Sequence, residues 1–336
     1  MLKRLTFLTA PAALLAAVPV AASAQDRPVL TVYTYDSFVS EWGPGPAIEE
    51  GFEAGCGCDL EMIGVEDGVA LLSRLRLEGG GSDADIVVGL DTNLIADAKE
   101  TGLFAPHGLD LPETDVPGGW DDPVFVPYDW SYFAFVYDTE AMEAPPESLK
   151  ALVEESEAEI LIQDPRTSTP GLGLLLWMKK TYGEDAADAW AQLAPRIVTV
   201  SAGWSESYGL FQEGEAPMVL SYTTSPAYHM LMEETDRYQA AEFEDGHYLQ
   251  IEVAARLAGS DQPELASDFL AFLIGPEAQS ILPTTNWMYP AVMPEDGLPD
   301  AFDTAVEPET ALLFTPEEVA ANRSDWVDEW LRALSR

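Results

Sequence analysis

The alternation of strand-like and helix-like segments constrains the fold of this chain most strongly. The β-branched and aromatic run at 29–35 is followed by a helical pattern near 47–53, and the run at 60–65 by a second helix that begins after Asp67. A further buried strand is predicted at 85–90. Chains that alternate strand and helix form mostly parallel sheets with helices on their faces. We therefore predict an α/β protein.

Two later segments indicate that the chain passes between two lobes and returns. The long aromatic strand predicted at 132–137 is a candidate for the first crossing, and the strand at 248–254 leads back to a new helix at 266–273. The length suits two domains, and a hydrophobic content of 47% is enough for two cores. The predicted division is residues 25–125 and 246–310 for lobe 1, and 126–245 and 311–336 for lobe 2.

The N-terminus has the layout of a signal peptide. Lys3 and Arg4 precede an apolar run at about 5–21, which ends in small residues up to Ala24. The run is too short and too broken by proline for a bilayer span. We expect residues 1–24 to be removed near Ala24 on export to the periplasm. No second membrane segment follows, so a soluble protein is expected.

The chain is strongly acidic. It has 16 basic and 59 acidic residues, for a formal net charge of -43. Such a field repels nucleic acid and anionic lipid and attracts cations. Nucleic acid is therefore not an expected partner. The charge agrees both with simple solubility and with steering of a cationic ligand.

The only two cysteines stand close together, at Cys56 and Cys58. A zinc site would need two more ligands of suitable spacing, and the three histidines show no such pattern. We therefore predict no metal site. In an oxidising compartment the pair is compatible with a local disulfide of structural role, and the sequence leaves its formation open.

Four loops at strand ends combine aromatic rings with hydroxyl or carboxylate groups. Flat rings and a few directional polar groups suit a planar, cationic heterocycle, because a ring cation over Trp or Tyr gains about 0.5–2 kcal/mol. Each residue also has a structural explanation: Asp67 as a helix N-cap, Trp42 as packing for a turn. The loop residues are Tyr35 to Ser37 with Trp42, Glu66 to Gly68, Thr167 to Pro170, and Tyr222 to Tyr228, with Trp204, Asn286 and Trp287 as further candidates.

A helix start is predicted at Thr169 and Pro170, with Thr169 as the cap. Its unpaired backbone N–H groups can hold an anion such as a phosphate, or the helix is simply well capped. Trp177, inside this apolar helix, is assigned to the core. Motifs of serine hydrolases, phosphate loops and zinc proteases are absent, so neither catalysis nor a cofactor is predicted.

At these same loops the sequence resembles the family of periplasmic thiamine-binding proteins of thiamine ABC importers. The matching segments span nearly the whole mature chain in order: 30–38, 42–46, 66–69, 163–173, 203–206, 220–229 and 286–290. The resemblance implies a two-lobed periplasmic-binding-protein fold of type II, in which each lobe is a mostly parallel sheet flanked by helices and the ligand lies in the interlobe cleft.

The resemblance also implies the ligands, the partners and the site. The ligands are thiamine, thiamine monophosphate and thiamine diphosphate, and a monomer delivers them to an ABC permease with its ATPase. The implied binding residues are Asp67 and Gly68 near the ligand, Ser168 and Thr169 at its phosphate or hydroxyethyl end, Trp204 and Tyr222, Thr223, Thr224 and Ser225, and the aromatic walls Tyr35, Trp42, Tyr228 and Trp287. The acidic surface departs from what we expect of this family.

Two other functions stay open at the level of sequence. The first is an exported protein that binds ferric ion, through Tyr222 and Tyr228 as phenolate ligands, or a polyamine. The second is a thiamine-degrading enzyme on a similar fold. Such an enzyme needs a nucleophile in the cleft, and the only thiols are those of Cys56 and Cys58, which lie outside the aromatic loops.

Overall fold

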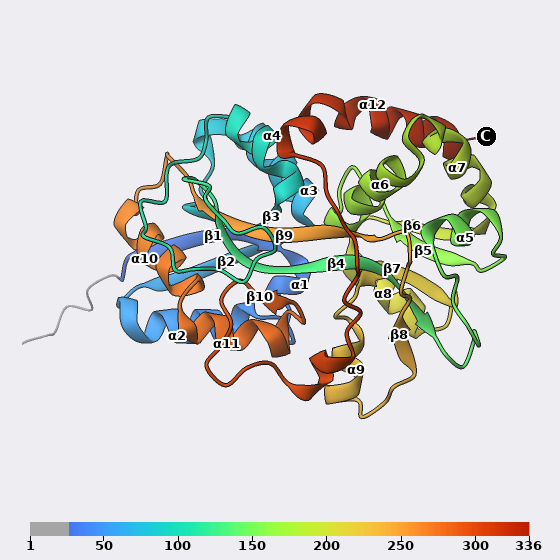
Figure 1. The fold of residues 1–336 in the computed structure, drawn as a ribbon. Helices are drawn as coiled ribbons and strands as arrows, with labels where there is room; N and C mark the ends of the chain where they lie inside the picture. The colour runs from blue at the N-terminus through green and yellow to red at the C-terminus, as the bar shows by residue number, and fades with distance from the viewer. Residues whose placement is uncertain (1–26, 336) are drawn as a thin grey trace, which may run out of the picture.

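The computed structural model describes residues 27–335. The predicted leader at 1–24 and its cleavage near Ala24 lie outside the described residues. Figure 1 shows two groups of strands and helices side by side, joined by two long strands. The protein is a two-lobed α/β molecule, as the alternation predicts. Within residues 27–335, none of the helices has the length and apolar character needed to cross a bilayer.

The first lobe is built on three parallel strands in the order β2-β1-β3. Their carboxyl ends point toward the second lobe (Figure 1). The elements of this lobe are β1 (Val29–Tyr35), α1 (Asp36–Val39), α2 (Gly45–Cys56), β2 (Asp59–Val65), α3 (Gly68–Glu78), η1 (Gly79–Gly81), β3 (Ile86–Asp91), η2 (Thr92–Leu94), α4 (Ile95–Glu100), α10 (Pro263–Leu273), α11 (Pro276–Thr285) and β10 (Tyr289–Pro290).

The second lobe repeats the plan with the parallel strands β7-β5-β6. Its elements are α5 (Leu149–Glu154), β5 (Ile160–Gln163), α6 (Thr169–Tyr182), η3 (Gly183–Asp185), α7 (Ala186–Leu193), η4 (Ala194–Arg196), β6 (Ile197–Ser201), α8 (Trp204–Gln212), β7 (Met218–Tyr222), α9 (Pro226–Met232) and β8 (Tyr238–Ala240).

Two long antiparallel strands join the lobes, β4 (Val126–Asp138) and β9 (His247–Arg256). The first half of β4 pairs with β9, and its second half pairs with β7 from Phe133 to Tyr137. The other end of β9 pairs with β3. One continuous sheet therefore runs through both lobes, and its two central strands are two of the covalent crossings between them.

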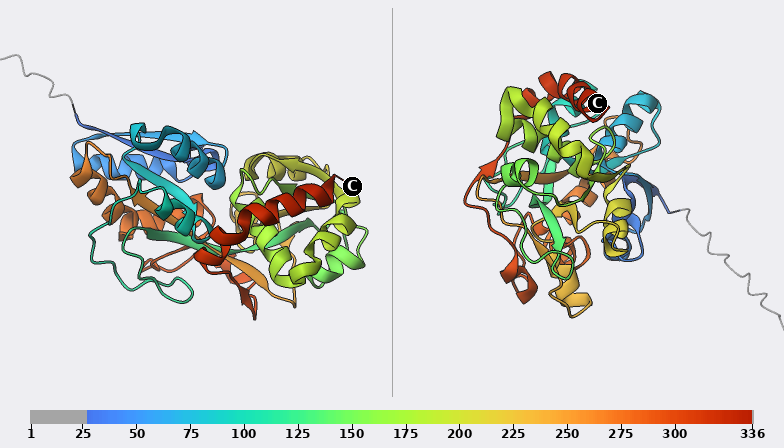
Figure 2. Two further views of the ribbon diagram at one scale, coloured as in Figure 1. Left: turned by 90° about the horizontal axis from the view of Figure 1, so that it is seen from above. Right: turned by 90° about the vertical axis from the view of Figure 1, so that its right-hand side faces the viewer.

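The C-terminal segment lies across the junction of the lobes. After η5 (Asp300–Thr304) and β11 (Ala311–Leu312), helix α12 (Pro316–Leu334) packs against α4 and η2 of the first lobe and α7 of the second. Figures 1 and 2 show α12 running from the lobe boundary along the second lobe. Thr315 caps the helix by accepting from the Glu318 N–H. The helix thus ties both lobes together on one face.

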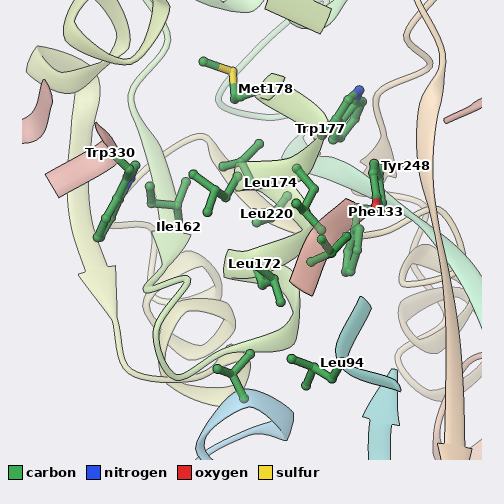
Figure 3. Packing of buried hydrophobic residues seen from close by; sticks show 14 of the residues in the cluster. Leu94, Phe133, Ile162, Leu172, Leu174, Trp177, Met178, Leu220, Tyr248 and Trp330 are labelled. Carbon is green, nitrogen blue, oxygen red and sulfur yellow. The ribbon is translucent and has the colours of Figure 1, made fainter. Parts of the chain in front are cut away.

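The larger hydrophobic core also includes both lobes. Figure 3 shows Leu174 and Trp177 of α6 with Phe133 of β4, Leu94 of η2 and Trp330 of α12. Full burial of such a side chain contributes about 1.5–3 kcal/mol. Trp177 is fully buried, as predicted, and its Nε1 donates to the Gly246 carbonyl at 3.1 Å.

A second core belongs to the first lobe alone, under α2, α10 and α11. Phe52 of α2 meets Phe269 of α10 edge to face, with ring centroids 5.1 Å apart. At the end of α2, Cys56 and Cys58 form a disulfide. The sequence left this bond open, and the structure places it at the turn between α2 and β2, away from the cleft, with Cys58 fully buried.

The predicted strands and helices are present, with two differences. The first crossing strand was predicted at 132–137, but β4 begins at Val126. The cap of α6 was assigned to Thr169, and this was wrong by one residue: Ser168 has the extended backbone of a cap and its Oγ accepts from the Gly171 N–H, while Thr169 is already helical. Both Ser and Thr cap well, so local sequence does not separate them.

Candidate ligand-binding site

A cavity of about 390 Å³ lies between the lobes at the carboxyl ends of the strands. This is where parallel sheets present their loops, and it is the usual place for a ligand. The cavity is lined by Tyr35, Ser37, Trp42, Asp67, Trp204, Ser205, Tyr208, Gly209, Gln212, Tyr222, Ser225, Tyr228, Glu252, Asn286, Trp287 and Met288.

Both lobes contribute to the lining because each loop follows a strand that ends at the cleft. Tyr35 ends β1, and Asp67 stands between β2 and α3. From the second lobe, Trp204 begins α8 and Tyr222 ends β7. A ligand in the cavity touches both lobes at once, so its binding favours their closed arrangement.

Aromatic rings form two walls. Trp204 stacks on Tyr208 with centroids 4.7 Å apart, and Trp42, half exposed, approaches Trp204 at 6.2 Å. On another side Tyr228 meets Trp287 edge to face at 5.3 Å. Trp287 follows the end of α11 and has a backbone φ of 57°. Positive φ is unusual for a residue with a large side chain. The walls offer flat faces to a planar ligand.

Asp67 joins the two lobes. Its Oδ1 accepts from Gly68 N at 2.8 Å and Thr169 N at 3.2 Å, and its Oδ2 accepts from Ser168 Oγ at 2.9 Å and Trp204 N at 3.3 Å. The predicted N-cap role is present, but most of these donors come from the other lobe. Burial raises the pKa of the Asp67 carboxyl, and the hydrogen bonds oppose that rise.

Of the thirteen predicted residues, eight line the cavity: Tyr35, Trp42, Asp67, Trp204, Tyr222, Ser225, Tyr228 and Trp287. Five do not line it but are buried next to residues that do: Gly68, Ser168, Thr169, Thr223 and Thr224. The role of each in binding stays a prediction. Gly68 is where the lobes touch, because a Cβ there would collide with the Gly89 carbonyl oxygen and Thr169 Oγ1.

The hydroxyl groups behind the cavity bind one another. Ser131 Oγ lies 3.3 Å from Thr223 Oγ1 and 3.2 Å from Thr224 Oγ1, and all three side chains are fully buried. Ser225 Oγ lies 2.7 Å from Ser221 Oγ, which accepts from Trp204 Nε1 at 2.8 Å. These bonds fix the turn between β7 and α9 and the orientation of the Trp204 ring.

The sequence reasoning missed six lining residues, namely Ser205, Tyr208, Gly209, Gln212, Glu252 and Met288. Glu252 is in the middle of β9, among apolar neighbours, and only the pairing of β9 with β3 and β4 brings it to the cleft. An acidic side chain inside a β-branched, apolar run was the available signal. Tyr208 and Gln212 lie one and two turns along α8 from Trp204, so helical spacing would have found them.

The described residues contain no group of three or more His, Cys, Asp and Glu side chains that could hold a metal ion. Tyr222 is half-buried beside carboxyl groups, and burial raises the pKa of its phenol well above the ordinary value, with Glu252 adding to the effect. Tyr222 therefore stays a neutral phenol at physiological pH.

Comparison with known proteins agrees with this geometry. The family model for bacterial extracellular solute-binding proteins matches residues 82–320. The thiamine-binding periplasmic protein of Escherichia coli is 57% identical over 97% of this chain and 98% of its own length, and that of Haemophilus influenzae is 43% identical over 94% and 95%. The chain belongs to the thiamine-binding periplasmic protein family.

Solved structures give the same result. A periplasmic thiamin binding protein of known structure superimposes with a TM-score of 0.90 at 57% identity, covering 92% of this chain and 97% of the other. Iron-bound HitA from Pseudomonas aeruginosa reaches a TM-score of 0.72 at 20% identity, over 91% and 99%, which shows a shared fold alone. The type II periplasmic-binding-protein fold implied by the resemblance is confirmed.

Proposed function

We propose that this member of the thiamine-binding periplasmic protein family binds thiamine in the interlobe cavity and delivers it to the permease of an ABC importer. The observation that carries the proposal is a cavity with aromatic walls and buried carboxyl groups that form no ion pair among the described residues. Thiamine joins two flat heterocycles, one of which carries a permanent positive charge. Both features are matched by the cavity.

The two lobes act together in this function. The thiazolium cation gains about 0.5–2 kcal/mol over an aromatic face, and more when water is excluded. Trp204 and Tyr228 come from the second lobe, and Trp287 follows α11 of the first. Closure brings these rings around the ligand, and the closed form is the state that a permease recognises.

We further propose that thiamine monophosphate and thiamine diphosphate are ligands. In support, α6 begins at the cleft, and Thr169 Oγ1 is buried without a hydrogen-bond partner among the described residues. The start of a helix favours anions. The Asp67 carboxylate already accepts from Ser168 and Thr169 there, so a phosphate group shares these donors with it.

Other proposals concern the whole chain. The lobes divide at 25–125 with 246–310 and 126–245 with 311–336. The protein acts in the periplasm as a monomer, after removal of residues 1–24, and uses no cofactor. Because the family is one of solute-binding transport proteins, we assign it no catalytic activity. The disulfide supports this, since both thiols that a thiamine-degrading enzyme would need are oxidised and outside the cleft.

The test is a calorimetric and fluorescence titration of ligand-stripped mature protein with thiamine, beside spermidine and ferric citrate. We expect saturable one-to-one binding of thiamine alone, with a change in Trp emission. Trp204→Ala should weaken the binding by about tenfold or more, because the stacked wall is lost, whereas Trp190→Phe, deep in the core, should not. If the protein instead bound ferric citrate and became coloured, or bound spermidine alone, the proposal of thiamine as the ligand would be wrong.

A further inference from the structure

Two buried carboxyl groups lie at the cavity in one hydrogen-bonded network. Glu252 of β9 is 5% exposed and lines the cavity, and Asp129 of β4, its cross-strand partner, is fully buried behind it. Glu252 Oε2 accepts from Tyr35 OH at 2.9 Å and Tyr128 OH at 2.8 Å. Asn286 Nδ2 donates to Asp129 Oδ2 at 2.6 Å and to Glu252 Oε2 at 3.5 Å.

No cation balances this pair within the described residues. Among residues 27–335, all its hydrogen-bond donors are neutral phenol and amide groups, and none of the ion pairs includes Glu252 or Asp129. The Oδ1 of Asp129 is buried and has no hydrogen-bond partner in the part of the chain that the structure describes. Two adjacent carboxylates in a low dielectric cannot both ionise at small cost, so such a pair retains a proton.

The other titratable groups around the pair add negative charge or none. Asp91 of β3 is the cross-strand neighbour of Glu252 on the other side, and Asp67, which also lines the cavity, adds a further negative charge. The phenols of Tyr35, Tyr128 and Tyr222 also face it. Burial raises the pKa of both Glu252 and Asp129, and their mutual repulsion raises that of Asp129 further.

We propose that Glu252 and Asp129 together form the element that recognises the positive charge of the ligand, by exchanging one shared proton for the ligand cation. This inference rests on the proposed function. In the ligand-free protein the pair carries one proton. When a cationic ring enters beside Glu252, the proton passes to the buffer and the pair becomes fully ionised, so that the ligand cation replaces the proton and the net charge of the site does not change. A neutral ring of the same shape displaces no proton.

The exchange predicts the sign of the pH dependence. Because binding of the cation releases a proton, thiamine affinity should fall as the pH falls through neutrality, by up to about tenfold per pH unit for one proton. Affinity for the neutral isostere, in which a thiophene ring replaces the thiazolium, should not follow this slope. The preference of the protein for the charged ring should therefore be larger at pH 8 than at pH 6.

The experiment is calorimetry of thiamine binding at pH 7 in phosphate and in Tris, two buffers of different ionisation enthalpy, with wild type, Asp129→Asn, Glu252→Gln and Asp91→Asn. The difference between the binding enthalpies measured in the two buffers gives the number of protons released when thiamine binds. We expect release from wild type and from Asp91→Asn, which changes a buried carboxyl outside the cavity, and no release from Asp129→Asn. Glu252→Gln should lose about tenfold or more of its preference for thiamine over the thiophene isostere.

Equal heats in both buffers for wild type, unchanged release from Asp129→Asn, or unchanged preference in Glu252→Gln would overturn the inference. Failure of wild type to bind thiamine at all would instead overturn the proposed function. The shared proton is then still tested by infrared spectroscopy of ligand-free protein. The infrared band of protonated carboxyl groups at pH 7 should be weaker in Asp129→Asn than in wild type. A band of equal intensity in both proteins would show that Glu252 and Asp129 do not share a proton.

Discussion

Asp67 is a residue of the first lobe whose carboxylate is held largely by the second. Three of its four hydrogen-bond donors belong to Ser168, Thr169 and Trp204. The backbone donors are at the starts of α6 and α8, where helices favour negative charge. Asp67 therefore stabilises the closed arrangement whether or not it also contacts the ligand.

Asp67→Ala should weaken thiamine binding by about 10- to 100-fold, since loss of a charged acceptor from buried donors costs roughly 1.5–3 kcal/mol. Small-angle scattering should show a larger radius of gyration for the variant at subsaturating thiamine. Glu66→Ala, an exposed carboxylate next to it, is the control and should behave as wild type. A variant that binds weakly but closes normally would mean that Asp67 acts on the ligand alone.

Asp91 makes the free energy of unfolding depend on pH. It is fully buried, and burial raises the pKa of its carboxyl from 3.8 to about 7. The folded state then binds a proton more tightly than the unfolded state, so this carboxyl lowers the free energy of unfolding as the pH rises from about 4 to about 7.

Asp91→Asn removes this titration and keeps an oxygen acceptor for the Asn93 N–H, but it loses the acceptor of the Asn93 Nδ2 hydrogen bond at both pH values. Relative to wild type, we therefore expect the unfolding free energy of the variant to be about 1–3 kcal/mol higher at pH 8 than at pH 4. Urea denaturation of both proteins at both pH values measures the difference. Equal differences from wild type at pH 4 and pH 8 would show that the carboxyl is not the titrating group.

At the scale of elements, α12 carries an ion pair across the lobe junction. Arg323 of α12 contacts Asp97 Oδ2 of α4 at 2.8 Å, and Arg76 of α3 contacts the other oxygen at 3.3 Å. Arg323 is largely buried, so Arg323→Ala should lower the free energy of unfolding by about 1–3 kcal/mol. Thermal denaturation measures this against Arg332→Ala, an exposed residue of the same helix. Equal melting temperatures in the two variants would contradict the bridging role.

Elements that depend on local pattern were predictable, and those that depend on long-range pairing were not. Strand β1 and the helix after Asp67 follow from β-branched runs and capping chemistry, and the loops after them share one edge because parallel strands end together. Glu252 became a cavity residue only through the antiparallel pairing of β9 with two strands distant in sequence. The extent of β4 from Val126 likewise depends on β9 as its partner.

At the scale of the whole molecule, the net charge of -43 acts on ligand encounter. A field of this sign raises the local concentration of cations and the association rate constant, and salt screens it over about 10 Å at 0.1 M. Stopped-flow Trp fluorescence should show the association rate constant for thiamine falling severalfold between 10 and 300 mM NaCl, which are about the limits of weak and strong screening. The neutral thiophene isostere should show no such fall. Equal salt effects on both compounds would assign the acidic surface to solubility alone.

The disulfide between Cys56 and Cys58 also has a practical consequence. The chain contains two cysteines, and both are in this bond, so cysteines introduced elsewhere are the sole targets for maleimide dyes under non-reducing conditions. Leu77 on α3 and Met232 on α9 are strongly exposed and belong to different lobes. A dye pair at these two positions converts lobe closure into an energy-transfer signal, and so makes the protein a reagentless optical sensor for its own ligand.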